Sequence, residues 1–294
     1  MNENSIDGAQ EIEKIARNVL IGAKAWGVFP TPVDRILSYA ELQVASGVDL
    51  SKVEPGFFTT KVHSLQRAVS KWLAAVDLRE KTVYLDLSQK PERQRFSKLH
   101  ETGHEVLKWQ RDTYFYLDDN HSLDPDTDEL FERQASWFAS DTLFQLERFE
   151  DEIAKLPLTI KSPLALAKHF GGSRHASLRR YVQKSKKRCA LLVLNPPHRN
   201  REYAAEIRNY FQSPSFTKEF GVISWPTRCG LDFQFVKELK FGVRLHEKGQ
   251  IALATANREM VAFDYHFFNS SYNVFVLLLP PGEKIRSRTV IVAR

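Results

Sequence analysis

The spacing of apolar residues predicts helices through much of the first half of the chain. In residues 9–28, apolar side chains recur at the three- and four-residue intervals of a helix, at Ile12, Ile15, Ala16, Val19 and Leu20. Residues 30–42 continue with an apolar stripe behind Pro32, a residue type suited to a first helical turn. Residues 63–73 and Asp128–Phe144 also have helical spacing. We therefore expect several amphipathic helices before residue 150.

A change of period in residues 73–87 predicts a β-hairpin within this helical region. Val76 and Leu78 alternate with polar residues, as do Val83 and Leu85, and the polar segment 79–81 makes the turn. The chain then returns to helical spacing in residues 89–109, with Pro91 near the start. Residues 110–128 are polar and contain several aspartates, and they are predicted to form a loop with at most a short helical turn.

The pattern of apolar and polar residues changes after residue 157. Residues 162–188 predict two short helices broken at Gly171 and Gly172, compatible with a helix-turn-helix. From Cys189 onward, β-type apolar runs dominate: CALLVLN, GVISW, LDFQFV, QIALATA, YNVFVLLLPP and RTVIVAR. We expect an α+β protein with three parts: residues 1–157, a helical module at 158–188 and a β-rich domain at 189–294.

Composition favours a globular protein in a reducing compartment. Hydrophobic residues make up 43% and charged residues 27% of the 294-residue chain, which allows a substantial core. No run of about 18 apolar residues indicates a transmembrane helix, and the polar start MNENSIDGAQEIEK lacks the pattern of a secretory signal. Cys189 and Cys229 are too few for a cysteine zinc motif and are expected to be buried. The expected location is cytoplasmic, without membrane contact.

The net charge of +6 favours an acidic partner without requiring one. Basic residues gather after the predicted helix pair, at Arg179, Arg180, Lys184, Lys186, Lys187 and Arg188. They could contact the phosphates of DNA, but a solvated helix face or a linker between two domains explains them better, and the DNA interpretation has little support.

The stretch RFSKLHETGHEVLKW carries the candidate chemistry. His100 and His104 are four residues apart in a predicted helix, so both imidazoles point to one side and can reach a single metal ion. Glu101 is adjacent and is positioned to act on a water molecule rather than to bind the metal. This is the HExxH arrangement, in which the glutamate is the general base.

A catalytic zinc needs a third protein ligand. Glu132 is the leading candidate because it lies among apolar residues on the helix Asp128–Phe144, where an unpaired carboxylate would be costly. Glu129 and His121 remain alternatives. Gly103 is unusual inside a helix and costs about 1 kcal/mol relative to alanine. Close approach of another backbone or of substrate would offset that cost, although a tolerated surface glycine is also possible.

Two segments, PERQRFSKLHETGHEVL and FERQASWFAS, resemble the ImmA/IrrE family of zinc metallo-endopeptidases. The resemblance covers residues 30 to 145 and extends more weakly to about 185. It implies a zincin-like domain that holds Zn²⁺ through His100, His104 and Glu132, with Glu101 as the catalytic base. Ser136 stands where the family usually has asparagine, and DTLFQ replaces the family's LLMP. These departures leave the ligands and the base unchanged.

The resemblance also implies the reaction and the substrate. Family members cleave transcriptional repressors, so a helix-turn-helix repressor is the expected protein substrate. An oxyanion-stabilising group is expected from Tyr114, Tyr116 or His121. The β-rich domain is expected to resemble a GAF-type sensor. The remaining histidines are interpreted as ordinary core or surface residues: His169, His175, His198, His246 and His266.

Two further interpretations belong to other classes of protein. The chain could be a DNA- or protein-binding regulator that retains a zincin scaffold without protease activity. It could also be a toxin–antitoxin component built from the same parts.

Overall fold

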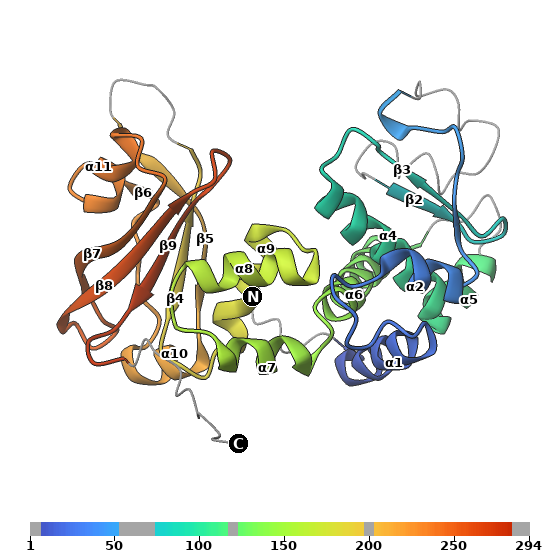
Figure 1. Ribbon diagram of the computed structural model, residues 1–294, viewed down its shortest axis with the longest axis horizontal. Helices are drawn as coiled ribbons and strands as arrows, with labels where there is room; N and C mark the ends of the chain where they lie inside the picture. Colours follow the sequence, from blue (N-terminus) through green and yellow to red (C-terminus); the bar gives the residue numbers. More distant parts are fainter. Residues whose placement is uncertain (1–6, 53–73, 117–122, 197–202, 284–294) are drawn as a thin grey trace, which may run out of the picture. The chain divides into compact units, whose positions relative to one another are not determined.

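The computed structural model describes residues 7–52, 74–116, 123–196 and 203–283 (Figure 1). The chain divides into two compact units. The first contains residues 1–149 and 168–173, and the second contains residues 150–167 and 174–294. The three domains expected from the sequence, with limits at residues 157 and 188, stay a prediction. Within the described ranges, every helix is too short or too polar to cross a bilayer.

The first unit combines a small sheet with helices. Strand β3 (Thr82–Leu85) lies between β1 (Gln43–Val44), which runs parallel to it, and β2 (Ala74–Asp77), which runs antiparallel. The helical elements of this unit are α1 (Ala9–Gly22), α2 (Val33–Tyr39), η2 (Leu50–Lys52), α4 (Pro91–Val106), α5 (Lys108–Tyr116) and α6 (Pro125–Leu143). Helix α7 (Glu147–Lys155) begins in the first unit and continues in the second. The helix expected at 63–73 lies outside the described residues.

The predicted hairpin is confirmed as β2 and β3. Its turn is held by Asp77, whose Oδ1 accepts hydrogen bonds of 2.9 Å from the backbone N–H groups of Arg79 and Glu80. Lys81 closes the turn with a φ of 52°. The polar segment between the two apolar runs therefore forms the turn that its composition predicts.

Helices α4 and α6 pack together, and Gly103 lies at a close contact between them. A Cβ atom at Gly103 would lie 3.1 Å from the Cα of Ala135 and 3.2 Å from the ring of Phe138. Ala135 and Phe138 are fully buried in this contact. The expectation that another backbone approaches Gly103 is confirmed. The packing that this approach allows offsets the free-energy cost of a glycine inside a helix.

Helix α6 begins three residues earlier than the sequence pattern suggested. Asp124 caps it by accepting hydrogen bonds of 3.1 Å from the backbone N–H groups of Asp126 and Thr127, and Pro125 occupies the first turn. The apolar pattern begins only at Leu130, so the polar first turn was not recognised as helix.

The prediction of a loop from residue 110 was wrong, because helix α5 continues to Tyr116. Helix α4 ends where Leu107 adopts an extended conformation, with a ψ of 90°, and α5 begins at once. Some of the polar side chains that suggested a loop make contacts inside the protein. Gln110 is fully buried. A guanidinium nitrogen of Arg111 lies 3.8 Å from a carboxylate oxygen of the buried Glu105.

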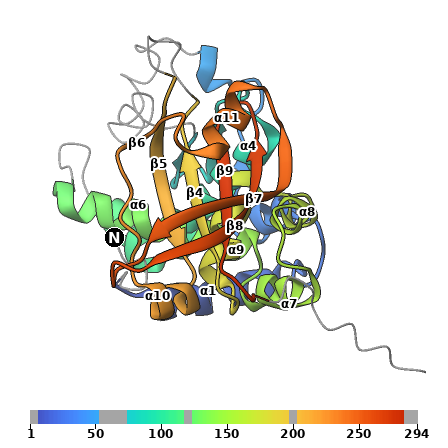
Figure 2. The same ribbon diagram turned by 90° about the vertical axis from the view of Figure 1, so that its left-hand side faces the viewer.

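The second unit is built on a six-stranded antiparallel sheet. Its order is β6 (Arg228–Cys229), β5 (Ala205–Gln212), β4 (Ala190–Leu194), β9 (Val274–Leu279), β8 (Met260–Asn269) and β7 (Leu245–Ala254). Figure 2 shows β7 and β8 running across the direction of β4 and β5, so the sheet is strongly curled. The β-rich character expected after Cys189 is confirmed.

Both faces of this sheet are covered. Alternate residues of β4 and β9 enter a core with Phe216 of helix α10 (Pro214–Phe220) and Phe235 of helix α11 (Gln234–Lys240). The intervening residues Leu191 and Leu277 are buried on the opposite face, where helix α9 (Arg174–Lys184) contacts β4 and β5. Cys189 and Cys229 are buried and unpaired, as expected.

Two of the predicted strands were wrong. LDFQFV leads into helix α11, which buries Phe235, Val236 and Leu239 at helical spacing. GVISW is irregular because the side chain of Gln212 bonds to its backbone, accepting from Ile223 N at 3.1 Å and donating to Gly221 O at 2.7 Å. Strands β5 and β8 and helix α10 were not predicted, and the run RTVIVAR lies outside the described residues.

The two short helices predicted around Gly171 and Gly172 are confirmed. Helix α8 (Lys161–Phe170) ends immediately before Gly171, whose φ is 76°, and α9 begins at Arg174. A positive φ at this position favours glycine, which explains why the break falls here.

Enlarging Gly103 tests the packing of α4 on α6. We expect Gly103→Val to destabilise the protein by about 2 kcal/mol, because the added atoms would meet a backbone that cannot move away. Arg93→Val, on an exposed position of the same helix, controls for the helix propensity of valine, which costs about 0.5 kcal/mol. Urea unfolding measures both. Equal effects of the two substitutions would show that the close contact is unimportant.

Candidate metal centre

His100 and His104 project from the same face of α4, one turn apart. Both are buried, with 5% and 6% of their surface exposed, and their rings lie edge to face with centroids 4.9 Å apart. Their Nε2 atoms are separated by 3.2 Å. The helical spacing in the sequence thus brings two metal-binding nitrogens to one point.

Glu132 of α6 completes the cluster. Its Oε2 lies 3.0 Å from His100 Nε2, and its Oε1 lies 3.5 Å from His104 Nε2. Two ligand atoms at about 2.1 Å from a tetrahedral zinc ion are separated by about 3.4 Å. The three separations of 3.0, 3.2 and 3.5 Å therefore match the spacing that one such ion requires. Among the described residues, this is the group of three side chains that could hold a metal ion.

The alternative third ligands are placed differently. Glu129 has 69% of its side chain exposed and lies 4.0 Å from Arg133. It is not part of the His100–His104–Glu132 group. His121 lies outside the described residues. The structure thus brings Glu132, rather than Glu129, to the two histidines.

Each histidine has a partner on its other ring nitrogen. His100 Nδ1 lies 3.2 Å from Ser136 Oγ, so the serine at the family's usual asparagine position contacts this ring. His104 Nδ1 lies 2.8 Å from the side-chain oxygen of Gln110. Such partners hold the rings of metal-binding histidines in place. Neither contact was predicted, because Gln110 was assigned to a loop and only a helix beginning at Lys108 brings it back to His104.

The electrostatics of the cluster favour a cation. Burial lowers the pKa of His104 to about 4, so this imidazole is neutral near pH 7. Burial opposes the charged form of Glu132, but the hydrogen bond with His100 and the electrostatic effect of the neighbouring imidazoles outweigh it and lower the pKa of that carboxyl. Burial likewise opposes protonation of His100, yet Glu132 and Glu101 raise its pKa.

Glu101 lies beside these groups in a desolvated position. It is 5% exposed, and burial raises its pKa to about 7, with His100 opposing the rise. A carboxyl group that changes protonation state near neutral pH can both take and give a proton under physiological conditions. This property suits a general acid–base residue.

Buried polar contacts hold helix α4 in place around the cluster. Arg95 donates to the backbone carbonyl oxygens of Thr31 and Gly171, the latter at 3.1 Å. The ammonium group of Lys81, at the hairpin turn, donates to the buried carboxylate of Glu105. The start of α4 and the turn that follows the two histidines are therefore both tied to neighbouring segments.

The candidates for an oxyanion-stabilising role differ in position. Tyr114 of α5 is partly buried and packs edge to face on His104, with ring centroids 5.9 Å apart, and also on Phe131 at 5.8 Å. Tyr116 is 89% exposed. Tyr114 is therefore the described candidate that lies next to the cluster.

Several basic residues proposed as DNA contacts are engaged within the second unit. The guanidinium of Arg179 lies over the ring of Phe211 at 5.2 Å, and Arg180 is buried. Lys184 lies 3.6 Å from Glu150, and Arg188 bonds to Glu219 and Glu283. These contacts support a structural role for much of the basic segment.

The scattered histidines occupy ordinary packing positions. His169 stacks on Phe29, His175 packs against Phe275, and His246 lies 3.1 Å from Glu238. His266 is buried and accepts a hydrogen bond from Ile160 N. His198 lies outside the described residues.

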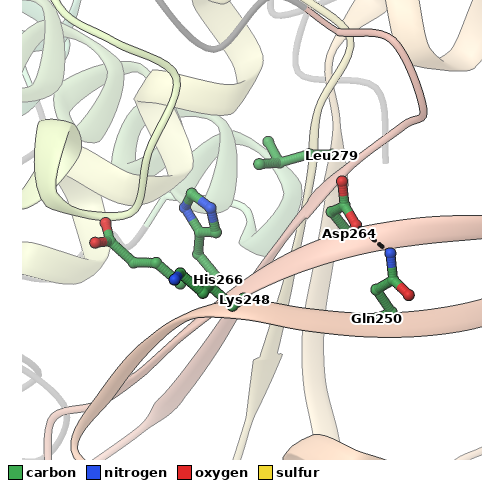
Figure 3. Close-up of a pocket in the computed structure, with 6 residues that line it drawn as sticks. Lys248, Gln250, Asp264, His266 and Leu279 are labelled. Carbon is green, nitrogen blue, oxygen red and sulfur yellow. Dashed lines mark hydrogen bonds between the residues drawn. The ribbon is translucent and has the colours of Figure 1, made fainter.

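A polar recess lies on the sheet of the second unit (Figure 3). Its volume is about 410 Å³, and it is formed by β7, β8 and the end of β9. Within it, Gln250 donates a 2.9 Å hydrogen bond to Asp264. The residues that line it are Glu247, Lys248, Gln250, Asp264, His266 and Leu279.

Fold and site together define a mixed α+β protein with a candidate His-His-Glu metal centre. Residues 59–181 match the family described as the IrrE N-terminal-like domain, a peptidase family. This segment, which includes all four candidate site residues, is therefore similar to the catalytic domain of the ImmA/IrrE family.

Several solved structures are similar to the chain, and one of them shares the fold over most of its length. It is a Mycobacterium tuberculosis transcriptional regulator, with a TM-score of 0.57 and 10% sequence identity, and the likeness covers 94% of this chain and 78% of that one. No curated protein matches the chain significantly.

Proposed function

We propose that this protein is a zinc-dependent endopeptidase with a zincin-like catalytic domain. The observation that carries the proposal is the convergence of His100, His104 and Glu132 at separations that fit one tetrahedral ion. The match of residues 59–181 to the IrrE N-terminal-like domain, a peptidase family, supports the same function. His100, His104 and Glu132 hold the metal, and Glu101 is the catalytic base.

The chemistry divides between the metal and the chain. Bound zinc supplies a Lewis acid that polarises a peptide carbonyl and acidifies water. The Glu101 carboxylate takes the proton of the attacking water and delivers it to the amide nitrogen as the carbon–nitrogen bond breaks. The desolvation that raises the pKa of Glu101 makes its carboxylate a stronger base than an exposed one.

We further propose a helix-turn-helix transcriptional repressor as the protein substrate. This follows from the family resemblance, and the structural likeness to a protein named as a transcriptional regulator is consistent with a role in regulation. In this proposal the helical module at 158–188 and the β-rich domain at 189–294 regulate the peptidase. The direct test is incubation of the zinc-loaded protein with the repressor encoded nearby, followed by mass spectrometry of the fragments. An uncut repressor would remove it as the substrate.

Zinc binding is expected to depend on Glu132. Purified full-length protein should bind one zinc ion per chain. Glu132→Ala should weaken binding by more than the roughly 10- to 100-fold that loss of an outer partner costs. Glu129→Ala removes a carboxylate from the exposed side of the same helix and should leave affinity unchanged. Competition with a chromophoric chelator measures both variants. Full affinity in Glu132→Ala would refute the ligand assignment.

Glu101→Gln separates metal binding from catalysis. The amide has nearly the shape of the carboxylate but cannot take a proton, so we expect zinc content to be kept and cleavage to fall by about 100-fold or more. Cleavage of the repressor and zinc content are measured on the same preparation. Glu92→Gln, at an exposed position in the first turn of the same helix, is the carboxylate control and should change neither quantity. Unchanged biological activity in Glu101→Gln would favour the non-enzymatic regulator.

Tyr114→Phe tests the group beside His104. If the phenol hydroxyl stabilises the developing oxyanion, its loss should lower kcat by about 100-fold and change KM little. Tyr116→Phe, on the exposed side chain, should have no effect. Steady-state cleavage kinetics give both constants. If kcat stays unchanged and only KM rises, Tyr114 acts in substrate binding instead.

A further inference from the structure

Gln110 is a fully buried polar residue that the predicted mechanism does not include. It lies in the first turns of α5 and is 0% exposed, so water cannot replace its hydrogen bonds. Its oxygen lies 2.8 Å from His104 Nδ1, and its nitrogen donates to Phe131 O at 3.0 Å and to Gln134 Oε1 at 2.9 Å. One side chain thus links a candidate ligand on α4 to two residues of α6.

The orientation of the Gln110 amide is dictated by its partners. The backbone carbonyl of Phe131 can only accept a hydrogen bond, so it requires the NH₂ group of Gln110 on that side. The side-chain oxygen of Gln134 also faces the NH₂ group of Gln110. Its identity as the oxygen is fixed because the same atom accepts from Trp109 Nε1, which can only donate. The Gln110 oxygen must therefore face His104.

We propose that Gln110 is a positioning residue that sets the tautomer of His104. An oxygen facing Nδ1 requires a hydrogen on Nδ1, which leaves the lone pair of a neutral imidazole on Nε2. Nε2 is the atom that faces His100 and Glu132. Without Gln110, the Glu132 carboxylate at 3.5 Å would attract the proton to Nε2 and block that nitrogen.

The two histidines differ in this respect. His100 Nδ1 faces the hydroxyl of Ser136, which can either donate or accept and so permits both tautomers. The constraint on His104 originates in the backbone of α6, at the residue immediately before Glu132. The element that supplies the third candidate ligand therefore also prepares the second.

The inference rests on the proposed metal centre, but its first test needs no metal. Long-range ¹H–¹⁵N correlation spectra of the zinc-free full-length protein report which imidazole nitrogen carries hydrogen. We expect a proton on Nδ1 of His104 in the wild type, and in Gln110→Met a shift of the population toward Nε2. A wild-type proton on Nε2 would overturn the proposal, whether or not the variant folds and whether or not zinc binds.

The second test measures zinc affinity by chelator competition. Gln110→Met should weaken binding about 10- to 100-fold, the usual effect of losing the partner of a metal-binding histidine. Gln145→Met is the matched control, because Gln145 is also fully buried in the first unit and makes three hydrogen bonds, to Gly27, Val28 and Thr31. The Gln145→Met substitution should lower stability to urea while leaving the His104 tautomer and the zinc affinity unchanged. Equal zinc affinity in the wild type and Gln110→Met, or an equal loss in both variants, would refute a specific role for Gln110.

Discussion

The close packing of α4 against α6 is the constraint on which the candidate site depends. The two histidines come from one helix and the carboxylate from the other, so their meeting requires the helix axes to approach closely at that level. Gly103 and Ala135 permit this approach, because a side chain at Gly103 would meet the α6 backbone at 3.1 Å. Gly103 lies between the two histidines in sequence. A change in the distance between α4 and α6 at this position would therefore change the distances between the histidine nitrogens and the Glu132 carboxylate.

Desolvation is the second requirement of the site. His104 and Glu101 are both buried, and burial shifts their pKa values in opposite directions. A buried histidine becomes a neutral donor and a buried glutamate becomes a base near neutrality. One structural cause thus accounts for both the capacity to bind a cation and the capacity to move a proton.

Much of this site could be predicted from the sequence, since its main features are local. Helical periodicity placed His100 and His104 on one face, and the cost of an unpaired carboxylate pointed to Glu132. Gly103 was recognised as a cost that needed a close neighbour. Gln110 could not be found in the same way, because its contact with His104 depends on the extended residue Leu107, which redirects the chain between α4 and α5. Its polarity suggested exposure, whereas it is satisfied internally.

The fold was less predictable in the β-rich part, where apolar runs alone do not distinguish strand from helix. LDFQFV alternates like a strand, yet Phe235, Val236 and Leu239 face the core from a helix. In GVISW the backbone bonds to the Gln212 side chain rather than to another strand. Such long-range choices depend on which segments meet in space, and one chain's local pattern does not record that.

The return of residues 168–173 to the first unit means that the unit with the candidate metal centre is discontinuous along the chain. Phe170 is fully buried there, its backbone carbonyl accepts from Thr31 N, and its ring packs on Phe29, Phe144 and Phe149. Gly171 adds the carbonyl that receives Arg95 of α4. A peptide excised at residue 150 or 157 would lack both supports. The candidate catalytic unit is thus completed by sequence that lies beyond its apparent end.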